Sequence, residues 1–188
     1  MANSGDSLPA HLRQRRDGSS GDRTSSYPPA PPALSVGVYD NHAHLEFAAG
    51  DNPMDYSTHL DQAGAVGVLG VVQVGTDVET SQWSAALASR EPRVLAAVAI
   101  HPNEAPLLAQ AGKLDEAMAA LDELASMPRV VAIGETGLDF FRTAEPLREA
   151  QKEAFREHIA LAKKHDLALQ IHDRDAHQAV VEVLLEVG

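Results

Sequence analysis

The sequence has no cysteine among its 188 residues. This absence excludes a disulfide scaffold, a thiol nucleophile and any zinc or iron–sulfur site that is held by cysteine. The sequence also has no uninterrupted apolar run close to the roughly 20 residues that a membrane-spanning helix requires. No apolar stretch follows the arginines near the N-terminus, so we see no secretory signal. We therefore expect a cytoplasmic protein with no membrane partner and no evident obligate protein partner.

Basic residues are scarce, because 15 Lys and Arg stand against 27 Asp and Glu and give a formal net charge of −12. This balance argues against broad electrostatic binding to nucleic acid, since basic side chains that neutralise phosphates supply most non-specific affinity. It does not exclude a phosphate-bearing substrate, because bound divalent cations would be the largest local charges in a site. Aromatic residues are few, whereas nine histidines are present. The positions of these histidines decide the functional interpretation.

The first 33 residues are rich in Ser, Gly, Pro and Arg and have no apolar periodicity. Such a composition cannot offset the entropy of the chain, and we predict a disordered tail over residues 1–33. The tail has four arginines against three aspartates, which favours a solvated extension over a segment that binds nucleic acid. We assign residues 34–188 to the folded part.

Short β-branched runs alternate with helical patterns from Leu34 onwards. Five strands are predicted, at residues 36–39, 66–74, 94–100, 130–133 and 167–171. The helices are predicted at residues 55–63, 77–89, 114–126, 146–164 and 174–187. This α/β alternation predicts parallel βαβ units, either in an open doubly wound sheet or in part of a (β/α)₈ barrel. No glycine-rich phosphate loop follows the first strand, which disfavours the nucleotide-binding version.

The segment DNHAHL, residues 40–45, is the most informative one and follows the first predicted strand. It holds His42 and His44, and residues two apart on a strand point to the same face. The two imidazoles can therefore converge on one cation, for which neutral imidazole is a common ligand. A chance pair of loop histidines is the alternative.

Three later strands are also followed by residues that can bind a metal: His101, Glu135 and His172. In a barrel these positions lie at the C-terminal face, where active sites are found. Carboxylate and imidazole together suit zinc and related metals. Taken singly, Glu135 could cap a helix, His101 could lie in a turn before Pro102, and His172 could pair with a nearby aspartate. The coincidence of such residues at four strand ends favours a shared site.

Four other histidines fall on predicted helices and are expected to be packing or solvated residues: His59, His158, His165 and His177. The alternating charges of residues 148–157 likewise predict a solvated helix face with supporting ion pairs. We assign no chemistry to these positions.

The chain resembles the TatD-type metal-dependent hydrolases. The resemblance rests on four segments in this order and spacing: DNHAHL, AIHPNEAP, AIGETGLDFFR and QKEAFREHIALAKKHDLALQIHDRDA. It runs from about Tyr39 to Gly188 and does not cover residues 1–33. It implies a (β/α)₈ TIM barrel of the amidohydrolase-like type, of which the chain holds about the first five βα units. It also implies a nuclease that cleaves DNA, 3′–5′ on single strands.

The resemblance further implies two divalent metal ions, Zn, Mn or Mg. By motif, His42 and His44 would hold one ion, Glu135 would bridge both, and His172 would bind the second. One ion would make hydroxide available from a bound water, and both would stabilise the charge that develops on the phosphodiester.

Two residues are expected to contact the substrate. His101 would lie near the phosphate as an orienting or proton-handling group, so that His101 and Glu135 are the predicted catalytic residues. Arg174 would hold an anion or a carboxylate. Phe140 and Phe141 follow GETGLD where the family often has a tyrosine, so one hydroxyl contact would be lost. The family's two further ligands lie in later segments that this sequence does not contain, and we expect impaired activity of the 188-residue chain.

Two alternatives stay open. The same scaffold could hydrolyse an amide or an aminoacyl ester on tRNA, since fold and metal ligands do not separate these substrates. The chain could also be an inactive fragment that acts only as a binding module, because an incomplete barrel leaves strand edges unpaired.

Overall fold

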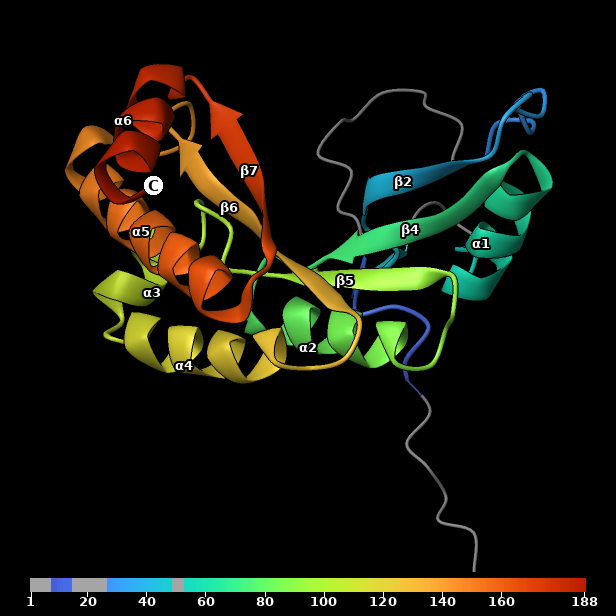
Figure 1. Cartoon of the computed structure of the whole chain (residues 1–188), viewed down its shortest axis with the longest axis horizontal. Helices are drawn as coiled ribbons and strands as arrows, with labels where there is room; N and C mark the ends of the chain where they lie inside the picture. The colour runs from blue at the N-terminus through green and yellow to red at the C-terminus, as the bar shows by residue number, and fades with distance from the viewer. Residues whose placement is uncertain (1–7, 15–26, 49–52) are drawn as a thin grey trace, which may run out of the picture. The chain divides into compact units, whose positions relative to one another are not determined.

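The computed structural model of the chain describes residues 8–14, 27–48 and 53–188 (Figure 1). The chain divides into two units, Met1–Val72 and Gln73–Gly188. Residues 1–7 and 15–26 of the predicted tail lie outside the described residues, so the prediction of disorder stays a prediction. Among the described residues, no helix has both the length and the hydropathy that a membrane span needs.

Among its described residues, the first unit contains two strand pairs and one helix. Its elements are β1 (Arg13–Gln14), β2 (Val38–Ala43), β3 (Phe47–Ala48), α1 (Tyr56–Ala65) and β4 (Val68–Val74), the last of which continues into the second unit. Strand β2 neighbours β4, and β1 pairs in parallel with β3. The β1–β3 pair was not predicted, and β1 falls within the predicted tail. Helix α1 begins close to its predicted start, where the Asp55 carboxylate accepts the Thr58 N–H at 2.7 Å.

The second unit alternates strands with helices. Its elements are α2 (Val78–Ala88), β5 (Val94–Val98), α3 (Ala105–Gln110), α4 (Leu114–Ala125), β6 (Val130–Asp139), the 3₁₀ turn η1 (Glu145–Leu147), α5 (Arg148–His165), β7 (Ala168–Arg174) and α6 (His177–Val187). Strands β5, β6 and β7 are neighbours in this order and pair in parallel. Figure 1 shows α2 and α4 against β5, and α5 and α6 against β6 and β7. The predicted α/β class with parallel βαβ units is confirmed.

A core cluster joins β6, α5 and α6. It consists of Leu138, Phe155, Ile159, Ala176, Val180 and Val183. On α5, the apolar side chains Phe155, Ile159 and Ala162 are spaced as on one face of a helix, and all three are buried. On β6, Leu138 packs against the helices, so Glu135 and Asp139 point to the opposite face of the strand.

Helix α2 confirms a local prediction. Its N-cap is Asp77, whose carboxylate accepts the Thr80 N–H at 2.8 Å, and the Thr80 hydroxyl accepts the Asp77 N–H at 3.0 Å. This reciprocal pair satisfies donors that the first turn of a helix leaves unpaired. Helix α3 was not predicted, and Pro146 lies in η1 rather than at the start of α5.

The predicted C-terminal ends of three strands were too early. Strand β6 runs to Asp139 rather than to residue 133, and β7 runs to Arg174 rather than to residue 171. Glu135 and His172 therefore lie inside strands, and α6 begins at His177 instead of residue 174. Likewise, β2 extends to Ala43, so His42 lies within this strand.

Gly134 and Gly137 explain why β6 continues beyond its predicted end at residue 133. A Cβ on Gly137 would lie 2.2 Å from the His172 carbonyl oxygen, and a Cβ on Gly134 would lie 2.4 Å from the Gln170 Cβ. Glycine at these positions lets the two strands approach each other closely. From the sequence alone, the same two glycines indicate a turn.

Candidate metal centre

The first unit brings together the two predicted imidazoles. His42 lies in β2 and His44 follows it, and their Nε2 atoms are 3.2 Å apart. The His42 N–H donates to the Asp40 carboxylate at 3.0 Å. The His44 Nδ1 lies 3.2 Å from an Oε1 of the fully buried Glu46. Two converging Nε2 atoms, one on a ring held by a buried carboxylate, suit two ligands of one cation.

The second unit brings together His101, Glu135 and His172. One ligand atom from each lies within 4.8 Å of the others. The His172 Nδ1 lies 2.8 Å from the Glu135 Oε1, and the His101 Nε2 lies 3.3 Å from the His172 Nδ1. The three side chains are only 14–20% exposed. In this largely buried group, the imidazole of His172 and the carboxylate of Glu135 fit a divalent ion such as zinc or manganese.

Asp139 is a residue of this site that the sequence analysis missed. Its carboxylate is 1% exposed and lies 3.2 Å from the His172 Nε2. It also accepts the Arg142 N–H at 2.8 Å and the Asn103 side-chain N–H at 3.2 Å. Strand alternation from Glu135 would have indicated Asp139, had β6 been predicted at its full length.

Two carboxylates raise the pKa of His172. The hydrogen bond to Glu135 is the largest cause that raises the pKa of His172, and the bond to Asp139 adds to it. Burial raises the pKa of Asp139, but hydrogen bonds from Arg142, Asn103 and His172 outweigh burial and leave this pKa below its ordinary value. Asp139 is thus held as a carboxylate that accepts from the ring.

His101 has a defined proton position. Its Nδ1 accepts the Asn103 N–H at 3.1 Å, so the neutral ring carries its proton on Nε2. This Nε2 is the atom that faces His172 and Glu135, at 3.3 and 3.8 Å. In this form His101 is a hydrogen-bond donor rather than a metal ligand.

Arg174 lies at the end of β7, two residues beyond His172. Its guanidinium stacks 3.9 Å from the centre of the Phe141 ring, and its carbonyl accepts the Phe140 N–H at 2.9 Å. Phe141 is 62% exposed. The anion-binding role predicted for Arg174 stays a prediction.

The other helical histidines have structural partners. His158 is fully buried, and burial lowers its pKa to about 4. His165 pairs with Asp122, His177 pairs with Asp173, and the His59 ring stacks edge-on against Tyr27. The contacts of His59, His165 and His177 agree with the packing or solvated roles that we expected.

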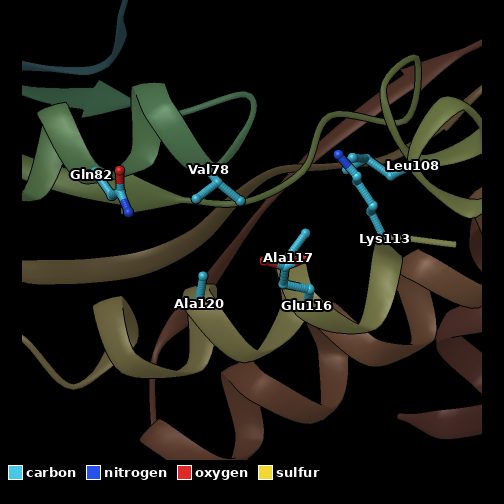
Figure 2. A pocket seen from close by; sticks show the side chains of 7 residues that line it. All are labelled: Val78, Gln82, Leu108, Lys113, Glu116, Ala117 and Ala120. Atoms are coloured by element: carbon cyan, nitrogen blue, oxygen red, sulfur yellow. The ribbon is translucent and has the colours of Figure 1, made fainter. Parts of the chain in front are cut away.

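A separate hollow of about 350 Å³ lies between α2, α3 and α4 (Figure 2). It is lined by Val78, Gln82, Leu108, Lys113, Glu116, Ala117 and Ala120. Lys113 and Glu116 are its only titratable lining groups among the described residues, and it has no histidine.

Comparison with known proteins gives one family. The model of the TatD related DNases matches residues 39–188. A metal-dependent hydrolase of Mycobacterium tuberculosis, named TatD, is 39% identical over 157 residues, which cover 80% of this chain and 57% of that protein. The 3′-5′ ssDNA/RNA exonuclease TatD of Salmonella typhimurium is 35% identical over 123 residues, covering 65% and 45% of the two chains. The chain thus spans about half the length of the curated relatives it matches.

Solved structures agree with this result. The TatD homologue YjjV of Escherichia coli superposes with a TM-score of 0.66 at 28% identity, over 79% of this chain and 55% of that one. A TatD family hydrolase of Entamoeba histolytica gives a TM-score of 0.63 at 20% identity, over 84% and 55%. The second likeness shows the fold alone.

Proposed function

Since the chain belongs to the TatD related DNase family, we propose that it is a metal-dependent hydrolase that cleaves the phosphodiester bonds of DNA, 3′–5′ on single strands. The convergence of His101, Glu135 and His172 in one half-buried group carries the proposal. The exonucleases named among its relatives support the substrate. A cytoplasmic location remains a prediction of the sequence.

We propose that His42 and His44 hold one divalent ion and that Glu135 and His172 hold another. The family resemblance supports a bridging role for Glu135. A bound ion of this kind lowers the pKa of a coordinated water and offsets the charge that builds up on phosphate oxygens.

Asp139 orients His172 in this proposal. A histidine that binds a metal through one nitrogen commonly donates the other N–H to a carboxylate. The His172 Nε2 lies 3.2 Å from the Asp139 Oδ2, so its Nδ1 is the nitrogen that presents a lone pair beside Glu135. The Asn103 side chain and the Arg142 N–H in turn hold the Asp139 carboxylate.

His101 handles the substrate rather than the metal. Its Nδ1 accepts from the Asn103 N–H, so its Nε2–H is able to donate to a phosphate oxygen. Arg174 offers a second donor to an anion from the end of β7, with its guanidinium held against Phe141. Both residues would orient the phosphodiester for attack.

The test measures both metal binding and cleavage by the 188-residue chain. We expect Mn²⁺ to bind. We also expect 5′-labelled single-stranded DNA to be shortened from its 3′ end with Mn²⁺ but not with EDTA, at a low rate, because this sequence lacks the segments that carry the family's two further ligands. Glu135→Gln should abolish the metal-dependent cleavage, because a neutral amide is a poor ligand for a divalent ion. Glu149→Gln, on an exposed part of α5, is the matched control and should leave both readouts unchanged.

Two results would contradict the proposal. One is a wild-type chain that neither binds Mn²⁺ nor cleaves DNA, and the other is cleavage that survives in Glu135→Gln. If the chain hydrolyses an aminoacyl ester and does not cleave DNA, the proposed substrate is wrong and the aminoacyl ester takes its place, because the same scaffold allows both reactions.

A further inference from the structure

Helix α5 buries two polar side chains, Gln151 and His158, and both have 0% exposure. They are seven residues apart, which is about two helical turns, so they lie on the same side of the helix. Polar groups are costly to bury unless hydrogen bonds satisfy them. Most of their partners lie in two of the three chain segments that carry His101, Glu135 and His172, which we call the metal group of the second unit.

His158 makes hydrogen bonds to a residue next to His101, which follows β5, and to a residue next to Glu135, which lies in β6. Its Nε2 accepts the N–H of Ile100, the residue before His101, at 3.1 Å. Its Nδ1 lies 2.9 Å from the hydroxyl of Thr136, the residue after Glu135. Because Nε2 is an acceptor, the neutral ring carries its proton on Nδ1 and donates it to Thr136. One buried ring therefore joins the backbone before His101 to the strand beside Glu135.

Gln151 completes this arrangement two turns earlier on the helix. Its side-chain N–H donates to the carbonyl of Pro102, the residue after His101, at 2.8 Å. Its Oε1 accepts the N–H of Asp139 at 3.0 Å. The N–H group also donates to the Thr143 hydroxyl at 2.7 Å. His101 is thus held on both sides, by His158 through Ile100 and by Gln151 through Pro102.

We propose that Gln151 and His158 are positioning residues, which fix His101 relative to Glu135 and Asp139 for metal binding and phosphate orientation. The inference rests on the proposed function, because it concerns the same metal group. Changes to residues that support metal ligands typically weaken metal binding by about 10- to 100-fold.

Four variants separate positioning from general stability. His158→Leu and Gln151→Met remove the hydrogen bonds at similar side-chain volume. His158→Gln keeps one acceptor and one donor for Ile100 and Thr136. Phe155→Leu changes a buried residue of the apolar core cluster on the same helix, and it serves as the matched control.

The first measurement is Mn²⁺ affinity of the 188-residue chain by titration calorimetry. We expect His158→Leu and Gln151→Met to bind about 10-fold more weakly or worse, and His158→Gln to stay within about 3-fold of the wild type. Phe155→Leu should bind as the wild type does. Equal affinity in all variants would overturn the inference, and so would an equal loss in Phe155→Leu and His158→Leu.

The second measurement needs no metal. The rings of His101 and His172 have centroids 4.5 Å apart, so each ring shifts the NMR signals of the other. We expect the imidazole signals of both to move in His158→Leu and Gln151→Met, and to stay in place in Phe155→Leu. If the wild-type chain binds no Mn²⁺, the proposed function fails at this site, and these signals still decide the inference. Ring signals that are unchanged in both hydrogen-bond variants would overturn it.

Discussion

Acidification should destabilise the chain through His158. Burial lowers the pKa of this ring from its ordinary value of 6.5 to about 4 in the folded protein. The neutral form fits its contacts, because Nε2 accepts the Ile100 N–H and a proton on Nε2 would oppose that donor. Folding therefore has to exclude a proton that the unfolded chain binds.

Because folding lowers the pKa of His158, the free energy of unfolding decreases as the pH falls. Above pH 6.5 the ring is neutral in both states, and its full contribution to stability is present. Between pH 6.5 and about 4 the unfolded chain binds the proton and the folded chain does not, so stability falls as pH falls. At 1.36 kcal/mol per pH unit, the loss at pH 4 is about 3 kcal/mol. This is a large part of the roughly 5–15 kcal/mol that stabilises an ordinary domain.

Urea unfolding from about pH 7.5 to about pH 4 measures this loss. Other groups also titrate in this range, so the readout is the difference between wild type and His158→Gln, which has no ring to protonate. We expect the free energy of unfolding of the wild type to fall by about 3 kcal/mol relative to that of His158→Gln on acidification. Phe155→Leu should lower stability by about 1 kcal/mol at every pH, since it changes packing alone. A difference between wild type and His158→Gln that is constant across the range would refute the reasoning.

Three other perturbations have defined outcomes. Gly137→Ala should lower the free energy of unfolding by about 2 kcal/mol or more, because φ is +125° and the added Cβ would lie 2.2 Å from the His172 carbonyl oxygen. Urea unfolding tests this, with Gly64→Ala as the control, since nothing lies within 4 Å of a Cβ there. Leu138→Ala should lower the free energy of unfolding by about 2–5 kcal/mol, because it leaves a cavity in the core cluster. The control is Val181→Ala at an exposed position, and equal stability of the two variants would contradict this expectation. Mn²⁺ at about 100 times its Kd should stabilise the chain by about 2.7 kcal/mol and EDTA should reverse this, so an unchanged Tm would count against the metal site.

The helices could be predicted where their signals are local. The inner face of α5 follows from the spacing of Phe155 and Ile159, and the start of α2 follows from its capping residue. The apolar spacing on α5 and a capping residue, Thr76 or Asp77, before α2 are both local signals; the part played by Thr80 was seen only in the structure. No distant segment is needed to interpret them.

The ends of β6 and β7 could not be predicted because they depend on each other. Gly134 and Gly137 indicate a turn when the sequence is considered locally. In the folded chain they are the positions at which the backbone of β7 comes too close for a side chain. That requirement appears only after two strands far apart in the sequence have paired.

The candidate site was predictable only where a general rule of sheet topology applied. The rule that parallel strands end at one edge indicated that His101 and His172 would approach Glu135, and they do. Asp139 was missed because its strand was predicted to end before it. Gln151 and His158 were missed as parts of the site because their partners, from Ile100 to Asp139, are supplied by other elements.

The two kinds of contact made by α5 differ in how strictly they fix a distance. The apolar contacts of Phe155 hold the helix against the core, but dispersion and burial change little when atoms move by a few tenths of an ångström. The hydrogen bonds of His158 are directional and weaken steeply once distance or angle departs from its narrow range. The apolar side chains therefore decide whether the helix docks, and the polar ones decide where Ile100 and Thr136 lie. For this reason we expect variants of Phe155 and His158 to lower stability alike and yet to differ in metal binding.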